Sequence, residues 1–236
     1  MTIYWTYTSI QSIFDLFPAG ELRDLLGKDE QAYLDHLRFE KRRREWLAGR
    51  LALKALLIES FQNLASRRFN QLQILKEEGG APRLALDEGE TPIPISLSHS
   101  NGSIFCACST GQSPIGVDLE LIEERSQAFI SDYFTPEEIS QVERHTPQKR
   151  SLYSTLVWSA KEAVLKALSI GLKMDTRRIN VNPESTSFEA GWKIPCSPVL
   201  IRQKESLRLL WRREGSFVLT VCFDGALSVD FRRILI

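Results

Sequence analysis

Trp158-Ser-Ala-Lys-Glu-Ala-Val-Leu-Lys166 is the stretch around which we expect the rest of the chain to be organised. Apolar residues recur at helical spacing through it, which predicts a helix over about 152–168 with one apolar face. Glu162 and Lys166 are four residues apart, so their side chains project from the same side of that helix. The two side chains form either a surface ion pair, worth a few tenths of a kcal/mol, or part of a functional site.

The first half of the chain contains a fainter copy of this helix. Trp46-Leu-Ala48 matches Trp158-Ser-Ala160 at an offset of 112 residues (158 − 46). Gly102-Ser-Ile104 matches Gly215-Ser-Phe217 at an offset of 113 (215 − 102), in each case leading into an apolar strand. Two matches at nearly the same offset indicate duplication of a unit that has one long helix and several strands.

The duplication predicts the fold class. We expect an α+β protein, a pseudo-twofold duplication of two similar α/β halves, each with a long helix packed on a small and mostly antiparallel sheet. The halves are placed at residues 1–112 and 113–236, with a ligand cleft between them. Asn101-Gly102 between two alternating runs predicts a hairpin, because both residues tolerate a positive φ. Strands are expected at residues 2–7, 71–76, 95–100, 103–108, 115–120, 207–213, 216–223 and 227–234.

Composition excludes several classes of partner. Thirty basic residues balance thirty acidic ones in the 236-residue chain, so no overall field favours nucleic acid or an anionic membrane. The N-terminus lacks the features of a signal peptide, and no apolar stretch approaches the ~20 residues that span a bilayer. We therefore expect a cytoplasmic protein, and a monomer, because each chain supplies both halves. The cysteines form no CxxC pair and are interpreted as small, reduced, buried hydrophobes: Cys106, Cys108, Cys196 and Cys222.

Two carboxylates share one face of a predicted strand. In Ile115-Gly-Val-Asp-Leu-Glu120, period two places Asp118 and Glu120 on the same face. At ~4 Å, a pair of like charges costs about 4 kcal/mol at an effective dielectric of 20. If Glu162 joins them, three negative charges meet, and Mg²⁺ suits such an oxygen-only cluster. Neutralisation by the lysines of the helix or by solvent is the alternative, and the spacing leaves both open.

Candidate phosphate contacts lie in the first half. His99 is at a strand end, where it is either a core-edge histidine with a satisfied nitrogen or a phosphate contact. The first-half helix begins with a basic cluster, which is either a solvated face or a surface for an anionic ligand with several phosphates. The cluster consists of Arg38, Lys41, Arg42, Arg43, Arg44 and Arg50.

Taken together, these motifs resemble a known family. Gly116-Val-Asp-Leu-Glu120, followed roughly forty residues later by Trp158-Ser-Ala-Lys-Glu-Ala-Val-Leu-Lys166, resembles the two signature motifs of the Sfp-type 4′-phosphopantetheinyl transferases. The resemblance covers residues from about 40 to 170, and it fits the duplication, since family members of this length are pseudo-dimers. Three upstream stretches are also similar to the family: Arg44-Glu-Trp-Leu-Ala-Gly-Arg50, Gly80-Ala-Pro82 and Ser96-Leu-Ser-His-Ser100.

The resemblance implies a holo-[acyl-carrier-protein] synthase type of reaction. The 4′-phosphopantetheine arm of coenzyme A moves to a serine of an apo acyl, peptidyl or aryl carrier protein, and 3′,5′-ADP leaves. Asp118, Glu120 and Glu162 would bind Mg²⁺, or Mn²⁺ in its place. Glu162, or a water it holds, would be the base, while Lys166 would stabilise the pyrophosphate and is a candidate to protonate the leaving group. The implied coenzyme A contacts are Arg44, Arg50, Arg83, Ser98, His99, Lys161 and Lys166.

One motif departs from the family pattern. Many relatives carry a lysine between Gly and Pro, where this chain has Ala81, and Arg83 is the substitute that we consider. For the 3′-phosphate of coenzyme A, Arg44 is placed ahead of Arg43 and Arg50. The carrier is not identified by these residues, and a carrier of fatty acid, polyketide, non-ribosomal peptide or lysine metabolism is compatible with them.

Two other functions stay open at this stage. One is a Mg²⁺-dependent phosphohydrolase of a nucleotide-like ligand, which needs no protein acceptor. The other is a non-catalytic coenzyme A-binding module, against which the intact set of acids and Lys166 counts. Four apolar residues in the polar segment 121–150 would argue against a phosphohydrolase if they form a docking surface for a carrier protein. Core packing explains these residues about as well. These apolar residues are Phe129, Ile130, Tyr133 and Phe134.

Overall fold

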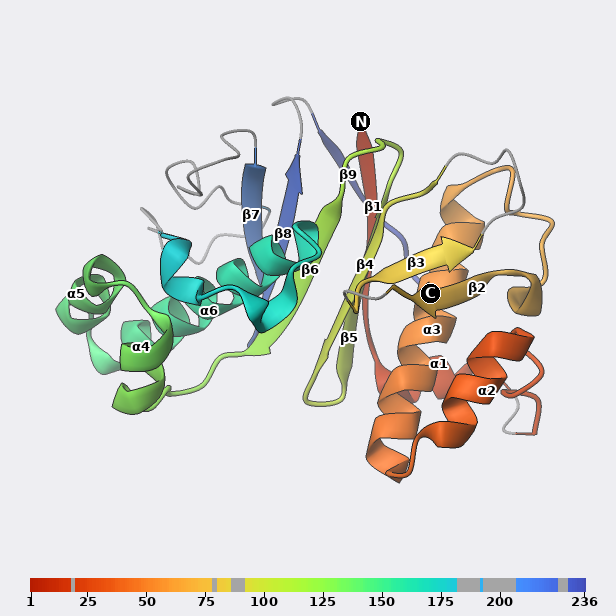
Figure 1. The fold of residues 1–236 in the computed structure, drawn as a ribbon, viewed down its shortest axis with the longest axis horizontal. Helices are drawn as coiled ribbons and strands as arrows, with labels where there is room; N and C mark the ends of the chain where they lie inside the picture. Colours follow the sequence, from red (N-terminus) through yellow and green to blue (C-terminus); the bar gives the residue numbers. More distant parts are fainter. Residues whose placement is uncertain (18–19, 78–79, 86–91, 182–191, 193–206, 225–228) are drawn as a thin grey trace. The chain divides into compact units, whose positions relative to one another are not determined.

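Two compact units make up the chain. The computed structural model describes all residues except 18–19, 78–79, 86–91, 182–191, 193–206 and 225–228 (Figure 1). Unit 1 comprises residues 1–113 and 228–236, and unit 2 comprises residues 114–227. No helix in the described part of the chain is long and apolar enough to cross a membrane.

The main sheet of unit 1 has the strand order β4-β5-β1-β9. Strand β1 (Thr2–Ser9) pairs antiparallel with β5 (Ser103–Ser109), which pairs antiparallel with β4 (Ile95–Ser100). The β4–β5 hairpin turns at Asn101-Gly102, whose φ angles are 44° and 77°, as the sequence predicts for this dipeptide. At the other edge, β9 (Asp230–Arg233) pairs parallel with β1.

Helix α3 (Glu40–Ser60) packs against this sheet, and its second half is buried on nearly every side (Figure 1). The apolar core between them includes Leu53 and Leu57 of the helix with Ile104 of β5. The smaller elements of unit 1 are α1 (Ile10–Asp15), α2 (Lys28–His36) and a two-stranded sheet of β2 (Gln73–Lys76) and β3 (Pro82–Ala85).

Unit 2 has a three-stranded antiparallel sheet in the order β6-β8-β7. Its strands are β6 (Ile115–Leu121), β7 (Leu207–Glu214) and β8 (Phe217–Asp224), and helix α6 (Pro147–Ala167) packs on the sheet (Figure 1). The helix therefore contains the whole stretch that the sequence analysis started from. Two shorter helices, α4 (Gln127–Tyr133) and α5 (Pro136–Arg144), precede it in the chain.

The two units repeat one plan. Helices α3 and α6 both have 21 residues. Apart from β9, each unit also has three antiparallel strands of which the last in the chain lies in the middle, β5 between β4 and β1 and β8 between β6 and β7. The fold is therefore α+β, with a long helix on a small sheet in each unit, as the sequence predicts.

The structure differs from the expected division at the C-terminus. We assigned all of residues 113–236 to the second half, but residues 228–236 belong to unit 1 because β9 extends the sheet of β1. The strand expected at residues 227–234 is shorter and lies in the other sheet. Hydrophobic patterning identifies a strand, but it does not say which sheet edge the strand joins.

Three of the cysteines are buried free thiols: Cys106, Cys108 and Cys222. Burial raises the pKa of each thiol, to about 12 for Cys108. These groups are therefore protonated and apolar in character, as expected for small core residues. Cys196 lies outside the described residues.

Candidate active site

Gly116 allows strand β6 to lie directly against helix α6. A Cβ atom at this position would be 2.0 Å from the carbonyl oxygen of Ala163 and 2.3 Å from the amide nitrogen of Ala167. Both atoms belong to the helix backbone, so no side chain can move aside to make room. The glycine therefore permits the close contact that brings the next residues on this face, Asp118 and Glu120, to the helix.

Asp118 is paired with Lys166. The Lys166 ammonium nitrogen lies 2.8 Å from Asp118 Oδ1, and the Asp118 side chain is almost fully buried while Lys166 is part-exposed. Neutralisation of the strand acids by a lysine of this helix is one of the two alternatives that the spacing allows. In this structure Lys166 neutralises Asp118, while 30% of the Lys166 side chain remains exposed.

Glu120 is held by Arg125 and Trp158. The Arg125 guanidinium lies 2.7 Å from Glu120 Oε2, and the Trp158 indole nitrogen donates to Oε1 at 3.1 Å. Burial, followed by the nearby Asp118 charge, raises the pKa of Glu120, while the bonds from Arg125 and Trp158 oppose the rise. The sequence does not predict this role of Arg125, because the residue lies in the polar segment 121–150, for which irregular structure with short helices is expected. Its only cue was a basic residue five positions beyond the acidic strand.

Glu162 completes a group of three interacting carboxyl groups. Burial and then the charge of Asp118 raise the pKa of Glu162 to about 7, with a further contribution from Glu120, while Lys166 opposes the rise. The unfavourable charge of this group is what a divalent cation would relieve.

The donor set fits Mg²⁺, which prefers oxygen ligands and keeps several waters. The described residues nevertheless hold no ready-made cluster of three or more acidic, histidine or cysteine side chains at metal-binding geometry. Asp118 and Glu120 instead have basic partners in Lys166 and Arg125. Metal binding by Asp118, Glu120 and Glu162 therefore stays a prediction.

The Glu162 carboxyl group predicts a pH dependence of stability. Because its pKa is about 7 in the folded protein and 4.5 ordinarily, the folded state binds more protons than the unfolded state between these values. In EDTA, thermal stability should therefore fall as the pH rises from about 4.5 to 7 and level off above 7. Thermal melts across this range should show a weaker fall for Glu162→Gln, and parallel curves for the two proteins would contradict the prediction.

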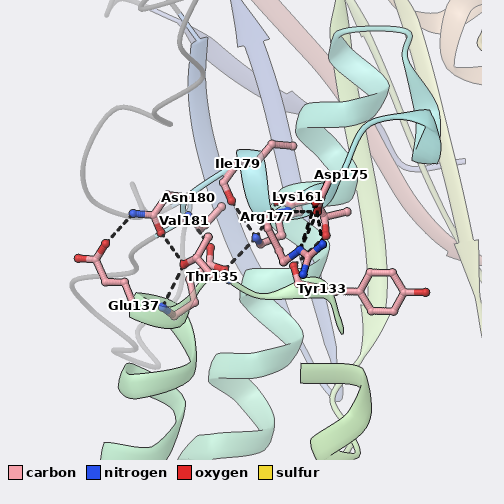
Figure 2. Close-up of polar contacts among 11 residues, drawn as sticks. Tyr133, Thr135, Glu137, Lys161, Asp175, Arg177, Ile179, Asn180 and Val181 are labelled. Atoms are coloured by element: carbon pink, nitrogen blue, oxygen red, sulfur yellow. Dashed lines mark hydrogen bonds and ion pairs between the residues drawn. The ribbon is translucent and has the colours of Figure 1, made fainter. Parts of the chain in front are cut away.

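Lys161, next to Glu162 on the helix, lies in the core of unit 2. Its side chain has no exposed surface, and its ammonium nitrogen is 2.8 Å from Glu138 Oε2. The same nitrogen donates to the backbone carbonyls of Thr176 at 2.9 Å and Ile179 at 2.8 Å (Figure 2). These three oxygens use all the protons of an ammonium group. The expected contact of Lys161 with coenzyme A has no support in this arrangement, and we assign the residue to the core.

Glu138 connects three parts of unit 2. As the third residue of α5 it closes a capping box with Thr135, accepting a backbone N–H bond at 2.7 Å. Its other oxygen accepts from the backbone N–H of Val181 at 2.7 Å. Figure 2 shows further hydrogen bonds between the segment 175–181 and the rest of unit 2, among them the bond from the Asn180 side chain to Glu137. The Lys161–Glu138 pair thus joins α5, α6 and the segment 175–181.

Unit 1 contains a second buried lysine–glutamate pair of the same construction. Lys54 of α3 lies 2.6 Å from Glu30, and neither side chain is exposed. Glu30 is the third residue of α2, where it accepts from the backbone N–H of Gly27, and its other oxygen accepts from Ile74 N–H. Lys54 also donates to the carbonyl oxygen of Leu25. Because unit 1 has this pair without the acidic strand, the pair is a feature of the repeated scaffold.

Two of the candidate coenzyme A contacts lie on strand β4 of unit 1. Ser98 is nearly buried, and His99 Nδ1 is 3.9 Å from Glu45 Oε2 of α3. Arg83, on β3, is exposed. The structure thus places His99 beside the basic part of α3, and phosphate binding by these residues stays a prediction.

Arg44 and Arg50 differ in exposure. Arg44 is exposed, with its guanidinium 4.5 Å from the ring centre of Phe14. Arg50 is buried, donates from Nε to the carbonyl oxygen of Ile74 at 3.1 Å, and lies over the Trp46 ring. Arg44 is therefore free to reach a ligand at the surface, whereas Arg50 has a structural role.

Comparison with known proteins shows which family the chain resembles. The family model of the 4′-phosphopantetheinyl transferase superfamily matches residues 114–222. A putative 4′-phosphopantetheinyl transferase of Synechocystis is 26% identical over 189 residues, covering 76% of this chain and 74% of that protein. The 4′-phosphopantetheinyl transferase HetI of Nostoc is 28% identical over 172 residues and covers 70% of each. Residues 114–222 therefore match the 4′-phosphopantetheinyl transferase superfamily, and the similarity to its members extends over about three quarters of the chain, 76% for the Synechocystis protein.

The comparison with solved structures gives a similarity over about half of the chain. The holo-[acyl-carrier-protein] synthase of Neisseria meningitidis is 21% identical with a TM-score of 0.36, covering 48% of this chain and 97% of that chain. The family model spans β6 to β8, so Asp118, Glu120 and Glu162 all lie within the matched residues.

Proposed function

We propose that the protein transfers the 4′-phosphopantetheine arm of coenzyme A to a serine of an apo carrier protein, with Mg²⁺ bound and 3′,5′-ADP released. The observation that carries the proposal is the convergence of the β6 acids with Glu162 and Lys166 of α6 in a chain that resembles this superfamily. The more specific assignment, a holo-[acyl-carrier-protein] synthase of the Sfp type acting as a monomer, belongs to the same proposal.

The residues of unit 2 have separate tasks in this reaction. When bound, Mg²⁺ would neutralise charge on the pyrophosphate, and Asp118, Glu120 and Glu162 would hold it. The part-exposed Lys166 ammonium would stabilise the negative charge that develops on the departing phosphate. Glu162, or a water it holds, would accept the proton of the serine hydroxyl.

Unit 1 would supply the remaining contacts to coenzyme A. His99 and Ser98 on β4 are proposed to bind phosphate, with Arg83 as a further contact. Arg44 is favoured over Arg50 for the 3′-phosphate, because its guanidinium is exposed while that of Arg50 is bound to a backbone carbonyl. A planar guanidinium can donate two parallel bonds to a phosphate.

Mass spectrometry of candidate carriers tests the proposal. We expect that incubation with coenzyme A, Mg²⁺ and a panel of apo acyl, peptidyl and aryl carriers adds phosphopantetheine to at least one carrier. Excess EDTA should prevent the addition and Mg²⁺ should restore it, because the three acids need a cation. Full transfer in EDTA would remove the metal from the proposal.

The same assay separates the two alternative functions. Release of 3′,5′-ADP from coenzyme A without any carrier would indicate a phosphohydrolase. Binding of coenzyme A with neither release nor transfer, across the whole carrier panel, would indicate a non-catalytic module. Glu162→Gln serves as the matched control both for transfer to a carrier and for release of 3′,5′-ADP without one.

A further inference from the structure

The Glu120 carboxylate has a donor on each of its oxygens. The two donors come from different elements, since Arg125 precedes α4 and Trp158 lies in α6. A carboxylate offers about four acceptor sites, so both oxygens keep capacity for another partner. The two bonds therefore orient the Glu120 carboxylate and leave acceptor sites on both oxygens for a cation, as hydrogen-bonding groups around metal ligands do.

Arg125 is itself held in place. Its second nitrogen lies 3.3 Å from Glu123, and its side chain is only 13% exposed. The guanidinium lies over the Phe129 ring, 5.2 Å from the ring centre. Phe129 in turn packs against Trp158, with ring centres 4.9 Å apart. The same aromatic contact therefore fixes both donors of Glu120.

We propose that Arg125 is a positioning residue that holds the Glu120 carboxylate in one orientation and thereby raises the affinity of the acidic group for a divalent cation. The inference rests on the proposed function for the use of a metal. Arg125 acts through Glu120 and touches neither substrate nor metal.

Simple electrostatics argues in the opposite direction. A positive charge beside the site repels a cation, so removing Arg125 would tighten metal binding if that effect were the larger one. Arg125 is, however, already paired with two glutamates, Glu120 and Glu123, which cancel much of its field. Losing a group that orients a metal ligand typically weakens metal affinity by about 10–100-fold, and we expect this effect to be the larger.

Titration with Mn²⁺, followed by electron paramagnetic resonance, tests the inference without catalysis. We expect Arg125→Gln to weaken Mn²⁺ binding by about 10–100-fold. Arg125→Lys keeps the charge but loses the planar guanidinium group that donates two parallel bonds. Its Mn²⁺ affinity should lie between that of Arg125→Gln and that of wild type. Unchanged or tighter Mn²⁺ binding in Arg125→Gln would overturn the inference. If wild type itself binds no Mn²⁺, the metal-dependent part of the proposed function fails instead.

Arg212→Gln is the matched control. Arg212 also forms an arginine–glutamate pair in unit 2, with Glu214, and its side chain is 24% exposed. It is in register with Leu219 of β8, which is in register with Leu119 of β6. Arg212 therefore lies on the sheet face opposite Asp118 and Glu120, and its loss should leave Mn²⁺ affinity unchanged.

A second variant keeps the inference testable if Arg125→Gln does not fold. Trp158→Phe removes the other donor of Glu120 while keeping an aromatic ring beside Phe129. It should also weaken Mn²⁺ binding, whereas an aromatic residue with only a packing role would leave the affinity unchanged. Wild-type affinity in both Trp158→Phe and Arg125→Lys would overturn the inference.

Discussion

Glu162→Gln is expected to lower phosphopantetheine transfer by about 10²–10³-fold while the protein stays folded. The substitution keeps the shape of the side chain but removes a charge that the proposed reaction uses to hold the cation and accept the serine proton. It also removes repulsion with Asp118, which helps to raise the pKa of Glu162 to about 7. In EDTA at pH 8, the variant should therefore unfold at a higher temperature than wild type. A transfer rate within a few-fold of wild type would show that Glu162 has only a structural role.

Lys166→Met distinguishes the role of Lys166 from that of Glu162 on the same helix. It should also lose transfer, but Mn²⁺ affinity should be retained, because Lys166 is not a metal ligand in the proposal. Its loss also leaves the buried Asp118 without its nearest cation, so a moderate loss of stability is expected as well. Steady-state rates, Mn²⁺ titrations and thermal melts of the two variants give the comparison, and loss of Mn²⁺ binding in Lys166→Met would contradict this division of roles.

The sequence predicts the elements of the site better than the contacts of its side chains. Period two along β6 and the spacing of four in α6 indicate which faces carry Asp118, Glu120, Glu162 and Lys166, because backbone geometry determines these directions. The bond between Arg125 and Glu120 depends on how the chain turns after β6. No periodicity describes that turn, so the contact cannot be predicted from the sequence pattern.

Lys161 shows a second limit of sequence reasoning. At the offset of 112 residues, Lys54 corresponds to Lys166, which suggests related roles for those two. By its contacts, Lys54 corresponds to Lys161, because each is fully buried against the third residue of a short helix. An adjacent pair such as Lys161 and Glu162 points in directions about 100° apart on a helix, so one can enter the core while the other faces the acids of β6.

We expect the largest losses of stability from substitutions in the two buried lysine–glutamate pairs. Lys161→Met should lower the free energy of unfolding by about 3–5 kcal/mol, because it leaves the Glu138 carboxylate buried without its cation. The carbonyl oxygens of Thr176 and Ile179 also lose their donor. Lys54→Met is the matched control in unit 1, where Glu30 would be left in the same position, and a similar loss is expected. Urea titrations of both variants measure the change, and a loss under 1 kcal/mol for Lys161→Met would contradict the assignment of this residue to the core.

The double variant Lys161→Met with Glu138→Gln decides between the core role and the phosphate contact implied by the family resemblance. Removing both charges of a buried pair costs far less than removing one. The amide oxygen of glutamine can still accept one of the two backbone N–H bonds, from Thr135 and Val181, that Glu138 accepts. We therefore expect the double variant to recover most of the stability lost in Lys161→Met and to transfer phosphopantetheine within a few-fold of wild type. If Lys161 contacts coenzyme A, the double variant will instead be stable and will still show a raised KM for coenzyme A or a lowered rate.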